Sequence, residues 1–139
     1  MQTDETTLYG RPDSLVKNLG IELIENKDGY IKATMPVDDR TSRPYEPTNI
    51  LNGGASLALS EIVAGYGSVA LCSDDQMPVG IQISANHVHM VTVGTYVEAI
   101  GEIIHRGKTS HIWNIEIKTP EGKLVSTARV VNLIVKKRP

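Results

Sequence analysis

A single carboxylate interrupts a long uncharged stretch of the chain. Glu61 is the only charged side chain between Glu46 and Asp74, and it lies within residues 52–73, which are apolar or small almost throughout. The length and composition of this run predict a helix enclosed on most sides. An unpaired carboxylate is costly to bury, so Glu61 either reaches a polar opening or has a raised pKa, and both are typical of functional acids. The alternative is a thin solvent-facing stripe on the helix.

The start of this predicted helix also carries groups that could do chemistry. Asn52 is a favoured N-cap residue, and Gly53-Gly54 after it leave backbone N–H groups open at the positive end of the helix dipole, where an oxyanion can be held. Glu61 follows Gly54 by seven residues, about 10 Å along the axis and on nearly the same face. A carbonyl resting against the helix start could therefore present its carbon to Glu61. An ordinary turn before a helix is the alternative.

The rest of the chain must position these groups. We expect a leader at residues 1–11 and one domain at 12–139, of α+β class. Its elements are a short helix from Asp13 or Ser14 to residue 19, a hairpin of strands 21–25 and 30–35, an ordered loop at 38–50, the long helix, and strands 79–90, 96–105, 112–118 and 124–135. The last four strands are expected to form an antiparallel meander on one curved sheet, and the length of strand 124–135 suggests that it has a central position.

Composition limits the functional classes. The net charge of -2 and the pI near 6.1 give no general reason to bind nucleic acid or an anionic membrane, and the apolar run is too short and interrupted to span one. Cys72 is the only cysteine, which excludes an intramolecular disulfide and favours a buried structural thiol. The polar, acidic N-terminus lacks the regions of a secretory signal, so we expect a cytoplasmic protein.

Several motifs together resemble the hotdog-fold acyl-CoA thioesterases. The similarity extends from about Leu15 to Val135 and is strongest to the aryl-CoA branch, which includes 4-hydroxybenzoyl-CoA thioesterases of the Arthrobacter type and the dihydroxynaphthoyl-CoA and phenylacetate-pathway enzymes. The motifs are Asn52-Gly53-Gly54-Ala55-Ser56 with Glu61 nine residues after Asn52, Val79-Gly80-Ile81, Ser84-Ala85-Asn86-His87-Val88, and His111-Ile112-Trp113-Asn114-Ile115-Glu116.

The resemblance implies a long central helix wrapped by a curved six-stranded antiparallel sheet. It also implies homodimers that join their sheets, commonly paired again into a homotetramer, with sites between subunits. Glu61 would be the catalytic carboxylate, acting either as nucleophile or as general base, and the Gly53 N–H would polarise the thioester carbonyl. No cofactor is expected beyond the coenzyme A of the substrate.

Three departures from the family pattern bear on activity. Asn52 stands where histidine is usual, and an asparagine can donate a hydrogen bond but cannot shuttle a proton. The loop before it is longer by about two residues and leaves Arg43, Glu46 and Asn49 as candidates for a site partner. Relatives often carry a serine or threonine at the position of Gly65. Ser68, one turn on, could substitute, although a packing role for this small residue is the alternative.

By resemblance, further residues would contact the coenzyme A part of the substrate: Gly54, Ser68, Val79, Gly80, His87, His89, Arg106 and Lys108. His87 and His89 are expected on one strand face along the pantetheine route. A metal pair is the competing interpretation of these two histidines, but no carboxylate or cysteine motif accompanies them, so we expect no metal. Arg106, Lys108 and the basic residues 136–138 could meet phosphates, and solvated turn charges are the default for them.

Three hypotheses follow. The first is an acyl-CoA thioesterase for aryl or medium-chain acyl groups. The second is a hotdog module that binds acyl-CoA without turnover, which Asn52 favours. The third is a hotdog hydratase, whose usual Asp/His pair is not found in this sequence. The retained Glu61 and Gly53-Gly54 favour the thioesterase. The chain contains no phenylalanine, so an acyl pocket would be built from aliphatic and tyrosine side chains.

Overall fold

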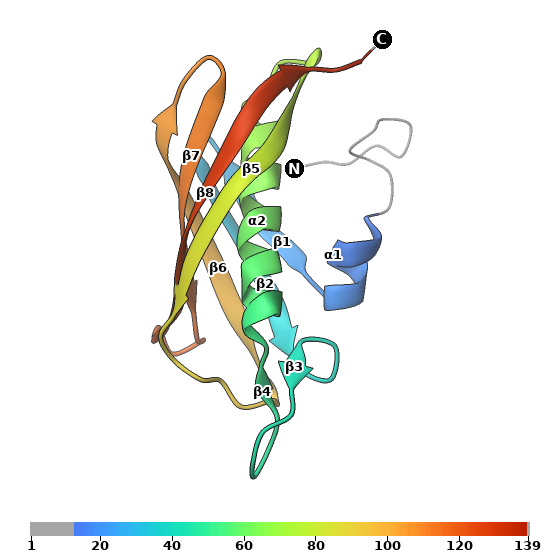
Figure 1. Cartoon of the computed structure of the whole chain (residues 1–139), viewed down its shortest axis with the longest axis vertical. Helices are drawn as coiled ribbons and strands as arrows, with labels where there is room; N and C mark the ends of the chain where they lie inside the picture. The colour runs from blue at the N-terminus through green and yellow to red at the C-terminus, as the bar shows by residue number, and fades with distance from the viewer. Residues whose placement is uncertain (1–12, 139) are drawn as a thin grey trace.

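The computed structural model describes residues 13–138 (Figure 1). The predicted leader at residues 1–11 therefore lies outside the described part of the chain. A six-stranded antiparallel sheet wraps the long helix α2, and the short helix α1 precedes the sheet, as the sequence predicted. The elements are α1 (Ser14–Leu19), β1 (Glu22–Lys27), β2 (Tyr30–Val37), β3 (Ser42–Arg43), β4 (Ile50–Leu51), α2 (Gly53–Val69), β5 (Gln76–His87), β6 (Thr95–Arg106), β7 (Ser110–Lys118) and β8 (Leu124–Lys136).

The strand order of the sheet is β1-β2-β6-β7-β8-β5. The expected meander of the last four strands is therefore wrong in one respect, because β5 pairs with β8 at the far edge and β6 pairs with β2. The connection at 88–94 crosses between the two sides of the sheet beneath the start of α2, where the Leu51 N–H donates to the Val91 carbonyl at 2.8 Å. Strands β6, β7 and β8 do form a meander, and β8 lies inside the sheet as predicted.

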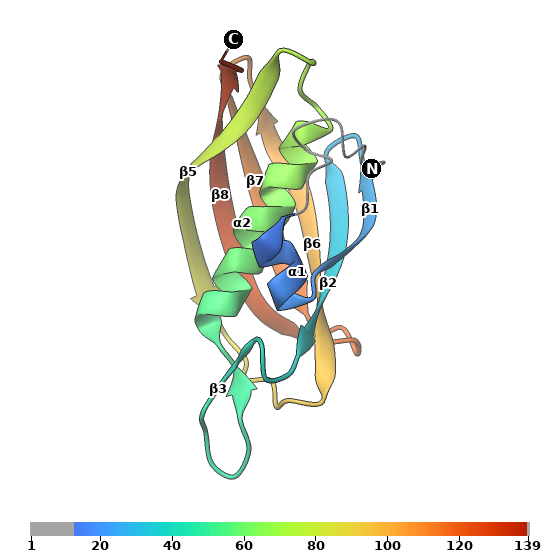
Figure 2. The same ribbon diagram turned by 90° about the vertical axis from the view of Figure 1, so that its right-hand side faces the viewer.

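The core forms between α2 and the concave face of the sheet, and Figure 2 shows the helix lying across that face. The two-residue period of the strands explains the packing, since alternate side chains of β2 and β7 are buried and the others are not. Trp113, Ile115 and Ile117 have no exposed area, as their alternation predicted. The buried side chains of α2 recur at helical spacing: Ala55, Ser56, Leu59, Ser60, Val63, Ala64, Gly67 and Ser68.

Some boundaries differ from the predictions. Helix α2 ends at Val69, so Cys72 lies beyond it and is half-buried, and burial raises the pKa of its thiol. Strand β5 ends at His87, so His89 does not share a strand face with it. A bulge between Gly80 and Gln82 leaves Ile81 unpaired, which shifts the alternation of the strand. The expected loop at 38–50 contains the short pair β3–β4.

The hydroxyl of Ser68 ties α2 to the sheet. Ser68 is fully buried, and its Oγ accepts from Trp113 Nε1 at 2.8 Å and from Asn132 Nδ2 at 3.0 Å. Its third partner is His111 Nδ1, at 2.8 Å. Asn132 Nδ2 also donates to the Ala64 carbonyl at 3.1 Å. Three strand side chains from β7 and β8 thus converge on one residue of the helix.

The bonding capacity of the hydroxyl determines the protonation of His111. A serine oxygen accepts at two positions and donates one proton, and both acceptor positions of Ser68 are taken by groups that can only donate. The Ser68 hydroxyl therefore donates to His111 Nδ1, which must be unprotonated, and the ring proton lies on Nε2. Burial, followed by the charges of Arg106 and His105, lowers the pKa of His111, which agrees with a neutral ring.

Replacing Ser68 by alanine should destabilise the fold more than any other single loss of a hydroxyl from α2. The change leaves buried donors of Trp113 and Asn132 and the acceptor of His111 without their shared partner, and we expect a loss of about 2–4 kcal/mol in the free energy of unfolding. Urea unfolding followed by circular dichroism measures it. The matched control is Ser60→Ala, since Ser60 is equally buried but donates only to the Ser56 carbonyl of its own helix at 3.0 Å. A loss of stability no larger than that of Ser60→Ala would contradict the proposed role of Ser68 in joining α2 to the sheet.

The neutral state of His111 also predicts a pH dependence. Its pKa is lower in the folded than in the unfolded chain, so the unfolded chain binds the proton first as the pH falls. The stability that the neutral His111 ring contributes is complete above about pH 6.5, the ordinary pKa of histidine. It is lost as the pH falls from there towards the lower pKa of the folded chain. The free energy of unfolding should decline from pH 7.5 to pH 5.5. His111→Gln should flatten this decline, whereas the same change at the exposed His105 should leave it in place.

Candidate active site

Glu61 lies on α2 at the side facing the edge strand β5. It is exposed, and none of the residues 13–138 forms a hydrogen bond or ion pair with its carboxylate. This exposed position agrees both with the expected polar opening and with the alternative of a solvent-facing stripe on the helix. Gly80 lies beside it across the helix–strand junction, since a Cβ at that position would lie 2.7 Å from Glu61 Oε1. The glycine leaves room for the carboxylate in this position, and a larger residue would displace it.

The start of α2 presents one N–H that its own cap does not use. Asn52 Oδ1 accepts from the Gly54 N–H at 2.8 Å, as its type predicted, and the Asn52 carbonyl accepts from the Ala55 and Ser56 N–H groups. The Gly53 N–H has no acceptor among the described residues. A Cβ on Gly53 would lie 2.9 Å from the His87 ring, so the helix start and the end of β5 are in close contact.

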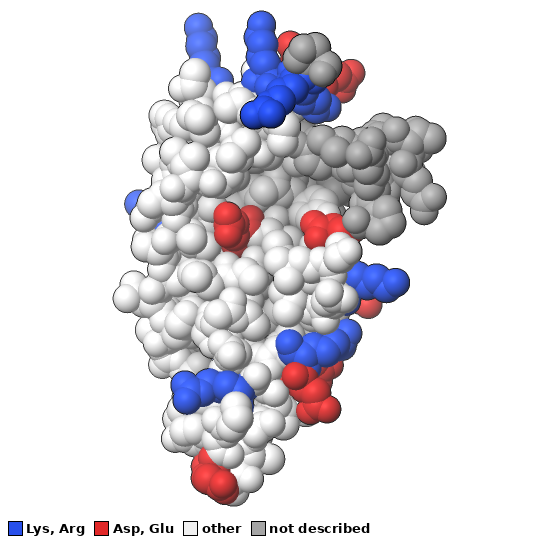
Figure 3. Space-filling view, turned by 45° about the vertical axis from the view of Figure 1, so that its right-hand side comes forward, with Lys and Arg blue, Asp and Glu red and all other residues white. Residues whose placement is uncertain are grey.

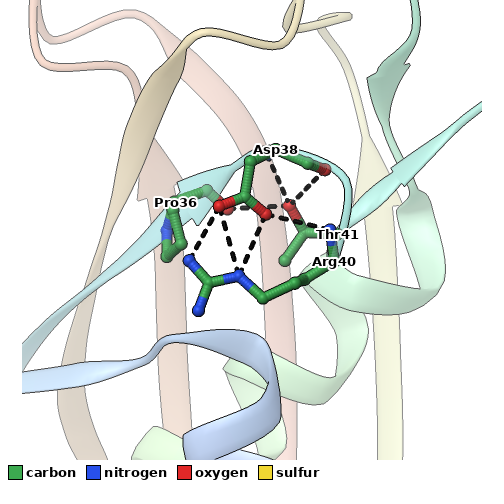
Figure 4. Close-up of polar contacts among 4 residues, drawn as sticks. All are labelled: Pro36, Asp38, Arg40 and Thr41. Carbon is green, nitrogen blue, oxygen red and sulfur yellow. Dashed lines mark hydrogen bonds and ion pairs between the residues drawn. The ribbon is translucent and has the colours of Figure 1, made fainter.

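The turn after β2 holds the chain in position for this helix start (Figure 4). The Thr41 hydroxyl donates to the Pro36 carbonyl at 2.7 Å, and the Asp38 N–H donates to the same hydroxyl at 3.1 Å. Arg40 Nη2 pairs with Asp38 Oδ2 at 2.7 Å, and hydrogen bonds from Arg40 lower the pKa of the Asp38 carboxyl. The Asn52 N–H donates to the Thr41 carbonyl at 2.8 Å, so this turn orients the cap residue directly.

A cleft of about 550 Å³ opens beside the helix start. Its lining includes Gly53, Arg43, Tyr45, His87 and His89, so it combines a helix N-terminus with cationic and aromatic side chains. The size is within the range of small-molecule sites, and the charge suits an anionic ligand. Of the three loop candidates, Arg43 lines this cleft, whereas Glu46 and Asn49 do not.

A single chain does not bring the Gly53 N–H and the Glu61 carboxylate to one carbonyl. They lie eight positions apart on α2, about 12 Å along the axis. A carbonyl that accepts from an N–H at about 2.9 Å while its carbon lies about 3.3 Å from an attacking oxygen spans only about 6 Å. The Glu61 side chain lies against Gly80, whereas Gly53 lies against His87, seven positions further along β5 and roughly 20 Å away.

Other residues predicted for the site lie elsewhere. Ser68 is buried in the cluster with Trp113, so it is not placed to contact a substrate, and its packing alternative agrees with the structure. Arg106 and Lys108 line a cavity beyond the C-terminal end of α2, with Arg106 Nη2 3.5 Å from the Leu71 carbonyl. That end of the helix is opposite to His87. Val79 is 41% exposed on the free edge of β5.

One side chain that supports the site had no signal in the sequence. Ser126 of β8 is buried, and its Oγ lies 2.9 Å from His87 Nδ1. The pair results from the register of the sheet, in which His87 faces Ser126. A periodicity analysis of either strand alone does not reveal such a cross-strand partner. No group of three or more His, Cys, Asp or Glu side chains among residues 13–138 is arranged to hold a metal ion.

Comparison with known proteins identifies the class. The model of the Thioesterase superfamily matches residues 48–126, which contain α2, Glu61 and β5. The chain is 37% identical over 125 residues to the 1,4-dihydroxy-2-naphthoyl-CoA hydrolase of Escherichia coli, a match that covers 88% of this chain and 87% of the relative. It is 36% identical over 122 residues to the proofreading thioesterase EntH of Cronobacter turicensis, covering 88% and 86%.

Solved structures agree with this result. Thioesterase HI1161 of Haemophilus influenzae has a TM-score of 0.81 at 34% identity, covering 88% of this chain and 82% of that one. The Staphylococcus aureus thioesterase SAV0944, solved as a mutant, has a TM-score of 0.83 at 35% identity, covering 90% and 100%. The chain belongs to the Thioesterase superfamily, it has the hotdog fold, and it is a thioesterase. Within residues 13–138, no helix has both the length and the apolar character that a membrane span requires.

Proposed function

We propose that this thioesterase hydrolyses an aryl- or medium-chain acyl-CoA to the carboxylic acid and free coenzyme A, with Glu61 as the catalytic carboxylate. The observation that carries the proposal is the position of Glu61: it is the one charged side chain of α2, it has no partner in the described chain, and it borders on Gly80. Water supplies the oxygen that the acid gains, and the thiol of coenzyme A leaves with a proton.

Gly53 and Asn52 supply the electrostatic part of the proposed mechanism. The free N–H of Gly53 stabilises the oxyanion that forms when the thioester carbonyl is attacked, and loss of one such donor typically costs about 100- to 1,000-fold in rate. Asn52 holds this donor in place by capping the helix. Glu61 acts either as nucleophile, through a mixed anhydride that water then cleaves, or as the base that activates water.

The separation between Gly53 and Glu61 supports a site shared by two chains. Strand β5 is a free sheet edge of twelve residues that exposes Val79 and Ile81, and an edge of this kind is ready to pair with another strand. Antiparallel pairing of two β5 strands would place Gly53 of the partner subunit near Glu61. We therefore propose a homodimer as the catalytic unit, with a homotetramer as a further assembly and the cytoplasm as its location.

The cleft of 550 Å³ is the proposed place for part of coenzyme A. Arg43, His87 and His89 provide positive or hydrogen-bonding groups there for its phosphates and pantetheine amides. Within one chain, Arg106 and Lys108 lie at the opposite end of α2, so they would reach a phosphate only across a subunit boundary. One relative is named 1,4-dihydroxy-2-naphthoyl-CoA hydrolase and another a proofreading thioesterase. Both names describe hydrolysis of a thioester, which supports a carboxylic acid as the product here.

The second candidate function is acyl-CoA binding without turnover. Asn52 favours it, because the family pattern has histidine at this position and an amide cannot transfer a proton. A thiolate is a fairly stable leaving group, however, so hydrolysis does not require an acid at Asn52. The free carboxylate of Glu61 beside Gly80 therefore weighs more in the comparison.

Glu61→Gln should abolish most of the hydrolysis. The change keeps the shape of the side chain but removes the negative charge that attacks or activates water, and we expect kcat to fall by about 100- to 10,000-fold. Release of free thiol from benzoyl-, hydroxybenzoyl-, phenylacetyl-, dihydroxynaphthoyl- and straight-chain acyl-CoAs gives both the loss and the substrate ranking.

The matched control for this change is Glu102→Gln, which removes an exposed carboxylate from β6, outside the cleft. Full activity in Glu61→Gln would rule out the proposed role. Binding of acyl-CoA without thiol release by the parent would favour the binding module, and recovery of turnover in Asn52→His would then locate the loss at that residue.

Gly80→Ala should reduce turnover without unfolding the protein. The new Cβ would lie 2.7 Å from Glu61 Oε1, and the end of a flexible side chain moves more easily than the strand. We expect kcat to fall at least tenfold, because a displaced carboxylate no longer lies in line with the carbonyl carbon. The unfolding midpoint in urea should change little. An unchanged kcat would show that the carboxylate does not work from this position.

A further inference from the structure

Two apolar hollows lie one behind the other on the side of α2 that continues from Glu61. The outer hollow, of about 210 Å³, is lined by Asp13, Ile62, Gly65, Tyr66, Val69 and Pro78. The inner hollow, of about 240 Å³, is lined by Val16, Ile21, Leu23, Ala33, Val63 and again Ile62 and Tyr66. Figure 3 shows this side of the molecule, where acidic side chains stand out from an otherwise uncharged middle.

The outer hollow begins beside the proposed catalytic carboxylate. Gly65 follows Glu61 by four residues and therefore lies on the same face of α2, one turn further on. On the strand side, Pro78 precedes Gly80 by two residues and points to the same face of β5. An acyl group whose carbonyl carbon is at Glu61 thus has an apolar surface next to it in the direction away from the cationic cleft.

Tyr66 forms the wall between the two hollows, together with Ile62. Its backbone carbonyl accepts from Asn26 Nδ2 at 3.0 Å, which fixes this turn of α2 to β1. Burial, and then the negative charge of Asp13, raise the pKa of Tyr66, so its phenol stays protonated beside the residue that caps α1. The backbone of this turn is therefore fixed to β1, and the ring, which lines both hollows, separates them.

We infer that Tyr66 sets the length of the acyl group by closing the outer hollow against the inner one. As the wall stands, the outer hollow is smaller than the usual range of ligand pockets, about 300–1,000 Å³, and takes a short chain or one ring. Removing the ring joins both spaces and extends the room to the residues beneath α1. The inference rests on the proposed function only in placing the acyl carbonyl at Glu61.

The experiment measures binding, so it does not depend on turnover. S-alkyl-CoA thioethers from ethyl to dodecyl are titrated calorimetrically into the parent, Tyr66→Ala and Tyr66→Phe. In the parent, Kd should fall about fourfold for each added methylene, the factor that burial of one CH₂ is worth, until the outer hollow is full. In Tyr66→Ala this fall should continue for at least two further methylenes, about 16-fold in total. Tyr66→Phe keeps the ring and should keep the limit of the parent.

Two further variants separate the wall from a general loss of packing. Val16→Phe in the Tyr66→Ala background refills the inner hollow from α1 and should restore the shorter limit. Tyr96→Ala removes a tyrosine of β6 that lines neither hollow and should leave the limit unchanged. Urea unfolding of each variant shows that it is folded under the conditions of the titration.

The outcomes keep this inference apart from the proposed function. An equal chain-length limit in folded Tyr66→Ala and in the parent overturns the role of Tyr66, even if Glu61→Gln abolishes thiol release. If the chain-length limit for thioether binding is longer in Tyr66→Ala but the parent releases no thiol from any acyl-CoA, the role of Tyr66 is supported and the proposed activity is contradicted. Absence of binding at every chain length, in the parent and in Tyr66→Ala, overturns the inference.

Discussion

The contact between α2 and the concave face of the sheet is the constraint on which the rest of the structure depends. It combines aliphatic packing with polar contacts, the most buried of which are the hydrogen bonds that Trp113 and Asn132 donate to the hydroxyl of Ser68. Apolar packing has little direction, whereas these hydrogen bonds fix both the rotation of the helix and its position along its axis. Rotation of α2 by one residue would turn Glu61 away from Gly80, so the geometry of the site depends on a hydroxyl located two turns away from it.

Much of this architecture could be predicted from the sequence because it follows from local patterns. The alternation around Trp113 identified β7, the turn at 26–29 identified the hairpin of β1 and β2, and the apolar run identified α2. The N-cap role of Asn52 also follows from its chemistry and position, and the structure confirms it. The exposure of Glu61 follows from the cost of burying an unpaired charge, and that cost is the same in every fold.

The features that could not be predicted depend on pairing between distant segments. The bulge at Gly80 and Gln82 shifts the face of β5, and a one-residue shift changes which side chains face the helix. The contact of His87 with Ser126 requires the register of β5 against β8, and no sequence motif states it. Ser68 was expected near a substrate because it shares a helix face with Glu61, but the curvature of the sheet covers that turn of the helix with Trp113 and His111.

Placing a donor and a carboxylate on one helix has a consequence for assembly. The two groups are separated by about 12 Å because a helix rises about 1.5 Å per residue, and no change of side-chain rotamer closes that gap. Under the proposed mechanism, a second helix start must therefore approach Glu61 from outside the chain. The free edge of β5 is the surface beside both groups, since Gly80 contacts Glu61 and His87 contacts Gly53. Pairing along this edge would bring Gly53 of the partner subunit to Glu61 and would give the free backbone groups of β5 hydrogen-bond partners. One contact would therefore serve both catalysis and assembly.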